Sequence, residues 1–364
     1  MNALEIYEQA KQITDPESRR SFLDSACAGD TALRRRVEAM LGITAVPEGF
    51  LGKPLVDGGD GRAASSVDMV QVGASPQPDA LLGALIGGVN LERLVGQGGM
   101  GKVYAGTQAS TGGTVAVKVL MPHAVSKGML KRFEQEARLL GRLRHPGIAQ
   151  IYSAGTAAAG GVTLPYFVME YIAEAQPITD YAEANNLSTT QRLELFRKAC
   201  EAVAHGHEHG VIHRDLKPAN ILVDRYGQPK VIDFGVAKCS DADTLPTTLT
   251  ADGEILGTLK YMSPEQASGD QDAITVRSDV YALGVILKEL LTRQTPFDLH
   301  KLPIEAVQIN KTHIPQPLSR LSHEFRGDLD AITAKCLEKD RHRRYASAAD
   351  LNADLGRCLS GIRS

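Results

Sequence analysis

HRDLKPAN, residues 213–220, places five polar or charged side chains within eight positions. Apolar residues flank it on both sides, as HGVI at 209–212 and ILV at 221–223. Charged side chains are costly to bury unless they find partners. A charged loop between two core-forming segments therefore predicts that its side chains converge on a common target.

A second feature is the glycine-rich segment LVGQGGMGKVY at 94–104. Gly96, Gly98 and Gly101 have the GxGxxG spacing, but a Rossmann fold requires a helix directly afterwards and an acidic residue about 20 positions on. Here a strand-like run and Lys118 follow instead. A P-loop is also disfavoured, because Val103 stands where Mg²⁺ binding requires a hydroxyl. A third interpretation is a β-hairpin whose glycines let the backbone lie over the phosphates of a nucleotide, and a plain glycine-rich hairpin stays open beside it.

Lys118 ends the apolar run VAVK, which is typical of a buried strand. A buried lysine requires an anionic partner. Two partners remain open: the phosphates of a nucleotide, and Glu136 in the helical segment FEQEARLLGRL at 133–143. The register with Leu139, Leu140 and Leu143 predicts that Glu136 faces inward, and Glu134 is the alternative.

Secondary-structure patterns divide the chain into parts. Residues 1–46 are predicted to form short amphipathic helices, with N-caps at Asp15-Pro16 and Asp30-Thr31. Residues 47–87 are rich in Gly, Ser, Asp and Pro, which predicts a flexible or disordered linker. From about 88 onward, short β-like runs surround one helix near 127–143, and helical periodicity dominates after 188. A strand-rich part followed by a helical part predicts two subdomains with a cleft between them.

Seven motifs occur in a fixed order: GQGGMGKV, VAVK, HRDLKPAN, DFG, GTLKYMSPE, SDVYALG and RRY. In this order the sequence resembles the protein-kinase superfamily, and most closely the bacterial Ser/Thr kinases of the eukaryotic (Hanks) type. The resemblance covers residues 88–358 and implies an α+β, bilobal fold, with a β-rich N-lobe at 88–170 and an α-helical C-lobe at 173–358. The small all-helical segment precedes it.

The resemblance implies transfer of the γ-phosphate of ATP to Ser or Thr hydroxyls of proteins, with Mg²⁺ as the metal and Mn²⁺ as its substitute. Such a reaction depends on positioning and charge neutralisation. By this resemblance Asp215 accepts or orients the proton of the acceptor hydroxyl, and Lys217 contacts the γ-phosphate. Asn220 and Asp233 supply oxygen ligands for Mg²⁺, and a hairpin spelled ILVD–RYGQ–PKVI brings Asp215 and Asp233 together. Thr258 is implied to bond Asp215 and Lys217 and to favour Ser/Thr acceptors.

The resemblance also implies the residues that bind adenine and support the lobes. The ATP site is expected to comprise Gly96, Gly98, Gly101, Val103, Ala116, Lys118, the gatekeeper Met169, the hinge from Glu170 to Ile172, and Leu222. A stacked spine is expected from Leu140, Ile151, His213 and Phe234. Glu265 and Arg344 resemble a buried ion pair, and Asp279 resembles a carboxylate that holds the catalytic-loop backbone.

Regulation is expected around Arg214, because an arginine beside a catalytic carboxylate needs its own anion. Lys238 matches a position that joins it. Phosphorylation of Thr250, or alternatively Thr248, would provide this anion and order the loop between DFG and SPE. Ala219 and Gln176 stand where arginine-directed kinases carry acidic residues, so we expect little preference for an upstream arginine.

Composition narrows the remaining classes. The formal net charge of -3 gives no basic field for nucleic-acid binding. Five scattered cysteines without CxxC spacing fit a reducing cytosol and no zinc site. No apolar stretch approaches the length of a membrane span, so we expect a cytoplasmic protein, tethered to a membrane only if the natural chain is longer. Protein substrates are the expected partners, with self-association during autophosphorylation. A small-molecule phosphotransferase and a nucleotide-binding scaffold remain as alternatives.

Overall fold

The computed structural model describes residues 6, 9, 10, 13, 15–27, 34, 37, 79–98, 101–120, 133, 137, 139–159, 162–234, 259–296 and 312–361. The chain divides into two compact units, Met1–Gln77 and Pro78–Ser364. In the first unit, α2 (Pro16–Ala26) begins where the sequence predicts a helix, because the Asp15 carboxylate accepts a hydrogen bond from the backbone N–H of Ser18 at 2.8 Å. The second predicted start, Asp30-Thr31, lies outside the described residues.

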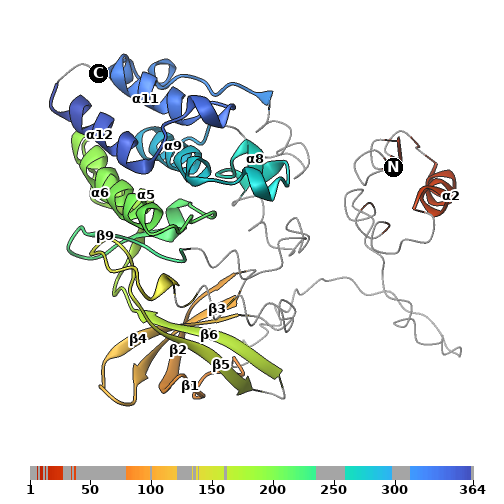
Figure 1. Ribbon diagram of the computed structural model, residues 1–364, viewed down its shortest axis with the longest axis vertical. Helices are drawn as coiled ribbons and strands as arrows, with labels where there is room; N and C mark the ends of the chain where they lie inside the picture. The colour runs from red at the N-terminus through yellow and green to blue at the C-terminus, as the bar shows by residue number, and fades with distance from the viewer. Residues whose placement is uncertain are drawn as a thin grey trace, which may run out of the picture. The chain divides into compact units, whose positions relative to one another are not determined.

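An antiparallel sheet forms the first lobe of the second unit (Figure 1). Its strands are β1 (Leu85–Ile86), β2 (Val89–Gly98), β3 (Gly101–Gln108), β4 (Thr114–Leu120), β5 (Ile151–Ala159) and β6 (Val162–Glu170), in the spatial order β1-β2-β3-β4-β6-β5. Alternate residues of a strand point to opposite faces, and the two faces of this sheet pack into different cores. Val115, Val117 and Val119 of β4 pack with residues of β1, β2 and β3, whereas Leu120 and Phe167 belong to the core that continues into the second lobe.

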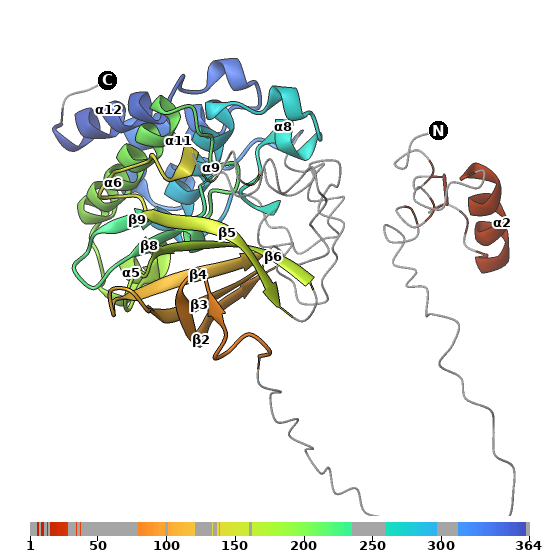
Figure 2. The same cartoon turned by 60° about the horizontal axis from the view of Figure 1, so that its bottom comes forward.

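The second lobe is helical and lies beside the sheet in both views (Figures 1 and 2). Its helices are α5 (Ile178–Ala184), α6 (Thr189–Glu208), α8 (Pro264–Ala267), α9 (Val276–Thr292), α11 (Asp328–Cys336) and α12 (Ala348–Leu359). Short 3-10 turns lie at Pro218–Asn220, Gln271–Ala273, Leu318–Arg320, His323–Phe325 and Arg341–Arg343. Helix α9 is buried on nearly every side, including its polar residues Ser278, Asp279 and Lys288, and α12 packs against α6. Within the described part of the chain, no helix has the length and apolar character needed to cross a bilayer.

A small sheet lies between the lobes and carries the charged loop. It consists of β7 (Gln176–Pro177), β8 (Ile221–Val223) and β9 (Pro229–Val231), and β8 and β9 form the hairpin predicted from the sequence. The backbone of Val231 in β9 donates to the carbonyl of Gly147 at 2.7 Å and accepts from Ala149 at 3.0 Å. The segment that leads into β5 is therefore hydrogen-bonded to the hairpin, which fixes the position of the sheet lobe over the loop.

The structure corrects one predicted boundary and one predicted face. The linker was expected to continue to residue 87, but Leu85–Ile86 pair with Asn90 and Val89 as strand β1. The apolar residues of the segment DALLGALIG at 79–87 cover the sheet, so the linker ends before this segment begins. Leu139 was expected to face inward with Leu140 and Leu143, but it is 48% exposed while the other two are buried.

Candidate active site

One buried carboxylate of the helical lobe holds the charged loop. Asp279, near the start of α9, is 1% exposed and accepts hydrogen bonds from the backbone N–H groups of His213 at 2.7 Å and Arg214 at 2.9 Å. Its Oδ2 also contacts Nε2 of His207, on the last turn of α6, at 2.8 Å. Arg214 has a φ of 68°, a left-handed conformation that costs free energy in a non-glycine residue. The three hydrogen bonds of Asp279 hold the loop in this conformation.

Asp215 lies at the centre of the loop and is surrounded by three of its neighbours in sequence. The amide of Asn220 donates to the Asp215 carbonyl at 2.7 Å and to its Oδ2 at 3.2 Å. Lys217 Nζ lies 3.1 Å from the same Oδ2. The backbone N–H of Asp215 donates to Nδ1 of His213 at 3.3 Å, and the opposite nitrogen of that ring contacts the carbonyl of Ile232 at 2.8 Å. Lys217 and Asn220 therefore converge on the Asp215 carboxylate, while the His213 ring contacts the backbone of Asp215.

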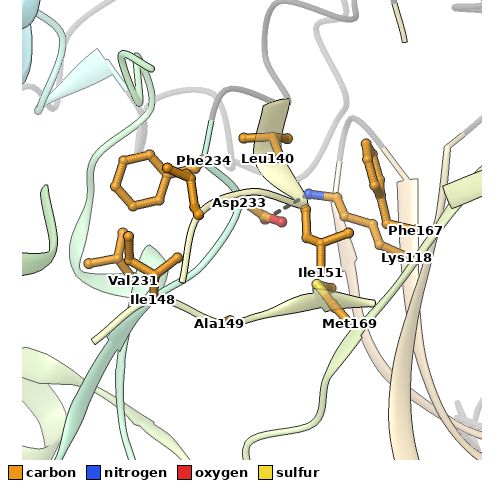
Figure 3. A pocket seen from close by; sticks show the side chains of 11 residues that line it. Lys118, Leu140, Ile148, Ala149, Ile151, Phe167, Met169, Val231, Asp233 and Phe234 are labelled. Carbon is orange, nitrogen blue, oxygen red and sulfur yellow. Dashed lines mark ion pairs between the residues drawn. The ribbon is translucent and has the colours of Figure 1, made fainter. Parts of the chain in front are cut away.

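Lys118 connects the two lobes. Its Nζ lies 2.6 Å from Oδ2 of Asp233, at the end of β9, and both side chains are largely buried (Figure 3). Asp233 has a φ of 61°, so the ion pair also stabilises an unfavourable backbone conformation. The anionic partner of Lys118 among the described residues is thus Asp233. The sequence left nucleotide phosphates and Glu136 open, and Glu136, like Glu134, lies outside the described residues.

A line of apolar side chains continues from this ion pair into the core. Phe234 packs on the ring of His213 with centroids 4.8 Å apart. Leu140 and Ile151 line the same pocket as Phe234, next to Lys118 (Figure 3). Of the four residues expected to form a spine, His213 and Phe234 are in ring contact, and Leu140 and Ile151 line the pocket that Phe234 also lines.

The glycine-rich segment forms a hairpin, as the third interpretation of its sequence predicts. Gly98, the last residue of β2, pairs with Gly101, the first residue of β3. A Cβ atom at Gly101 would overlap the carbonyl oxygen of Val119, whereas a Cβ at Gly96 would meet open space. Glycine is thus required at Gly101 by close backbone packing.

Cross-strand pairing places the expected adenine residues on one face of the sheet. Val103 pairs with Lys118, and Ala116 pairs with Met169. Since directly opposed residues share a face, Val103 and Lys118 lie on the side of Asp233. Leu222 lies on β8, in the hairpin that ends at the charged loop.

The hinge after β6 is fixed by its first residue. The Glu170 carboxylate lies 2.8 Å from Nζ of Lys230 on β9 and accepts from the backbone N–H of Gln150 at 3.2 Å. These contacts orient the start of the hinge. Ile172, the last residue expected in the hinge, follows two positions later.

A buried ion pair supports the loop from the helical lobe. Both terminal nitrogens of Arg344 contact the Glu265 carboxylate, at 2.7 and 2.8 Å. Burial alone would raise the pKa of Glu265, but the hydrogen bonds and charge of Arg344 and the hydroxyl of Ser278 outweigh it and lower that pKa. The next residue, Gln266, donates to the carbonyl of Arg214 at 2.7 Å. The ion pair predicted from the sequence is therefore connected to the charged loop through one further residue.

Five predicted site residues cannot be placed. Glu136, Lys238, Thr248, Thr250 and Thr258 lie outside the described residues.

Two side-chain oxygens in the cleft fit a divalent cation. Asn220 uses its Nδ2 for Asp215, which leaves Oδ1 as its acceptor atom, and Asp233 uses Oδ2 for Lys118, which leaves Oδ1. Mg²⁺ prefers such hard oxygen donors and is usually held by one or two side chains, with water and substrate phosphates completing its coordination. Among the residues that the structure describes, no group of three or more His, Cys, Asp or Glu side chains could hold a metal by itself. The donor set is thus suited to a metal that arrives with phosphates.

Sequence reasoning missed three residues that the structure places in or beside the site. His207 contacts Asp279, Lys230 contacts Glu170, and Gln266 contacts Arg214. None of these residues carries a local signal, because each partner lies at least 50 residues away along the chain.

A sheet lobe with a glycine hairpin, a helical lobe with a charged loop, and a lysine–aspartate pair between them define a protein kinase fold. Residues 89–354 match the family model described as the protein kinase domain. The chain belongs to the protein kinase family, which confirms the resemblance predicted from its motifs.

Individual relatives point to the bacterial branch of that family. The chain is 38% identical over 270 residues to the serine/threonine-protein kinase PknB of Mycobacterium leprae, covering 74% of this chain and 42% of that protein. It is 36% identical over 276 residues to a probable serine/threonine-protein kinase of Streptomyces coelicolor, covering 76% of this chain and 40% of that protein. The chain spans about two fifths of the length of these curated relatives.

Solved structures support the fold. A crystal structure of the kinase domain of Mycobacterium tuberculosis PknI is similar with a TM-score of 0.59 and 23% sequence identity, covering 77% of this chain and 99% of that chain.

Proposed function

We propose that this chain is an active serine/threonine protein kinase that uses ATP and Mg²⁺. The observation that carries the proposal is the convergence of Lys217 and Asn220 on Asp215, opposite the ion pair of Lys118 and Asp233. Every position that phosphoryl transfer requires and that the structure describes holds a residue of suitable chemistry.

The roles of the side chains follow from their contacts. ATP would supply the phosphoryl group; Asn220 and Asp233 would hold Mg²⁺ through their side-chain oxygens, and the metal would supply neutralisation of the phosphate charge. Lys118 holds Asp233 in place and presents a cation to the phosphates. Asp215 orients the acceptor hydroxyl and receives its proton, while Lys217 stays within reach of the transferred group and of Asp215. Gly96, Gly98 and Gly101 allow the hairpin to approach the phosphates, and Mn²⁺ is expected to substitute for Mg²⁺.

Acceptors are Ser and Thr residues of proteins. Thr258 is proposed to bond Asp215 and Lys217 and so to favour Ser/Thr acceptors. The names of the curated relatives, which are serine/threonine-protein kinases, favour the same preference. Ala219 and Gln176 provide no carboxylate for an upstream arginine, so little selection for arginine is expected.

Activity is proposed to be regulated by autophosphorylation. Phosphate on Thr250, or on Thr248, would face Arg214 and Lys238 and make charge-assisted hydrogen bonds with them. One molecule would present its loop to another, which requires transient self-association. We place the protein in the cytoplasm, acting on protein substrates and not on nucleic acid.

The test is incubation of the purified chain with MgATP labelled in the γ-phosphate and a generic protein acceptor. Label on phosphoserine and phosphothreonine after acid hydrolysis is the expected result, and mass spectrometry is expected to find phosphate on Thr250 or Thr248. Label on a small molecule alone would favour the small-molecule phosphotransferase. Nucleotide binding without transfer would favour the scaffold.

A further inference from the structure

The segment just before β2 covers the face of the sheet that is turned away from the catalytic cleft. Leu81, Ala84 and Ile86 pack against the core formed by Tyr104, Val117 and other residues of that face. Backbone hydrogen bonds fix the segment, because Gly83 donates to the carbonyl of Leu91 at 2.8 Å and Leu91 donates to that of Ala84 at 3.0 Å. The segment is therefore an integral part of the sheet lobe.

Asp79, at the start of this segment, contacts the glycine hairpin directly. Its Oδ2 lies 2.7 Å from Nζ of Lys102, and its Oδ1 accepts from the hydroxyl of Tyr104 at 2.9 Å and from the backbone N–H of Leu81 at 3.1 Å. The Asp79 side chain is only 11% exposed. Burial alone would raise its pKa, but these donors outweigh it and lower the pKa. Both carboxylate oxygens therefore accept charge-assisted hydrogen bonds, Oδ2 from the Lys102 ammonium and Oδ1 from two neutral donors.

The two β3 residues that Asp79 holds are next to the residue expected to contact adenine. Lys102 pairs with Val119 and Tyr104 pairs with Val117, so both lie on the face of the covering segment. Val103, between them, points to the opposite face with Lys118. Lys102 also directly follows Gly101, the glycine whose backbone packs against Val119. Movement of Lys102 and Tyr104 would therefore displace both Val103 and the tip of the hairpin.

We infer that Asp79 is a positioning residue for nucleotide binding: through Lys102 and Tyr104 it fixes the height of the glycine hairpin above the phosphate and adenine sites. The inference rests on the proposed function, since it assigns Asp79 to the ATP site of a kinase. Asp79 touches no reacting atom and acts only through β3. A purely structural ion pair would affect the stability of the lobe without a selective effect on the hairpin or on nucleotide affinity.

The experiment compares the full chain with Asp79→Ala, Asp79→Asn, Lys102→Met and the double variant Asp79→Ala/Lys102→Met. The control is Glu92→Gln, which removes an exposed carboxylate from the adjacent strand β2. Two quantities are measured: the Kd for Mg·ADP by calorimetry, and amide hydrogen exchange of a peptide spanning residues 94–106 without nucleotide. Steady-state kinetics then separates the KM for ATP from kcat.

We expect Asp79→Ala to raise the Kd and the KM for ATP about fivefold, equivalent to about 1 kcal/mol, with kcat within about twofold of the unmodified chain. Exchange in residues 94–106 should accelerate, Asp79→Asn should be intermediate, and the double variant should be no worse than Asp79→Ala, because the two side chains act as one pair. Glu92→Gln should change none of these values.

Unchanged affinity and unchanged exchange in folded Asp79→Ala would overturn the inference. So would faster exchange spread evenly over the whole lobe. If the unmodified chain does not bind Mg·ADP, the proposed function fails, whereas the exchange measurement still decides whether Asp79 fixes the hairpin.

Discussion

Replacement of Asp279 by asparagine tests how the catalytic loop is held. The change keeps the size of the side chain but replaces one carboxylate oxygen with an NH₂ group. The carboxylate accepts from the backbone N–H groups of His213 and Arg214, and Oδ2 also contacts Nε2 of His207. Asparagine can satisfy the donors on only one of the two oxygens, and its NH₂ group then faces a donor.

The size of the effect follows from burial. A buried donor left without an acceptor costs about 1–3 kcal/mol, and Asp279 is 1% exposed, so water does not replace the lost acceptor. If the Arg214 N–H is the donor that loses its partner, Arg214 also loses the contact that holds its φ of 68°. We therefore expect a loss of about 3 kcal/mol in the free energy of unfolding. For a domain of this size this corresponds to a Tm lower by about 6 °C.

The assay pairs thermal unfolding with phosphotransfer measured well below the new Tm. Asp279→Asn should lower kcat more than the KM for ATP, because the misplaced group is Asp215 and not the nucleotide site. Asp272→Asn, an exposed carboxylate in the turn just before α9, is the matched control and should change neither quantity. A Tm within 1 °C of the unmodified chain would refute this account of the loop, as would a normal kcat in a destabilised protein.

Four further predictions concern other parts of the site. Arg344→Met leaves Glu265 buried without its partner and should lower the free energy of unfolding in urea by about 3–5 kcal/mol. The control is Arg343→Met, on a side chain that is 69% exposed, and it should lower that free energy by less than about 0.5 kcal/mol. Equal effects of the two variants would contradict the buried ion pair. The folded-state pKa of Glu265 lies below its ordinary value of 4.5. The stability that this pair contributes is therefore present above pH 4.5 and is lost as the pH falls through the folded-state pKa. The difference in free energy of unfolding between the unmodified chain and Glu265→Gln/Arg344→Met should accordingly shrink below pH 4.5. Gly101→Ala should lower the Tm and weaken Mg·ADP binding in calorimetry, because its Cβ would overlap the Val119 carbonyl. Gly96→Ala should leave the Tm unchanged, because its Cβ would meet open space. A larger loss of Tm in Gly96→Ala than in Gly101→Ala would contradict the hairpin geometry. Lys118→Met removes the ion pair with Asp233 and should lower phosphotransfer by about 10²-fold or more, and a normal rate in a filter-binding assay would show that the pair is dispensable.

Local sequence signals predicted the parts of the fold whose physical cause is local. The Asp15 cap, the glycine hairpin and the hairpin of β8 and β9 each depend on residues within a few positions of one another. The convergence of the HRDLKPAN side chains followed from a charged loop between two apolar segments. Motif order then supplied the long-range pair of Glu265 and Arg344, which spacing alone could not have linked.

The failures have equally physical causes. Leu139 and Leu140 are about 100° apart on a helix of 3.6 residues per turn, so an apolar pattern that includes both does not determine which one is buried. Residues 79–87, DALLGALIG, are mainly apolar, but so short an apolar segment does not show which surface it covers, and only tertiary contact with the sheet shows that Leu81 and Ile86 join its core. The pairing of Asp79 with Lys102 has no local pattern, because it depends on a strand addition that composition does not reveal.

Replacement of Asp215 by asparagine tests directly whether the charged loop transfers phosphate from ATP to a protein acceptor. Asp215→Asn is compared with the unmodified chain in two measurements on the same samples. Transfer of labelled γ-phosphate to a protein acceptor is measured together with the Kd for Mg·ADP. We expect Ser/Thr phosphorylation by the unmodified chain and a rate of transfer lower by about 10³-fold or more in Asp215→Asn. The Kd for Mg·ADP of Asp215→Asn should be within about twofold of that of the unmodified chain. Equal transfer by the two proteins, or no transfer by the unmodified chain despite nucleotide binding, would contradict this function of the loop.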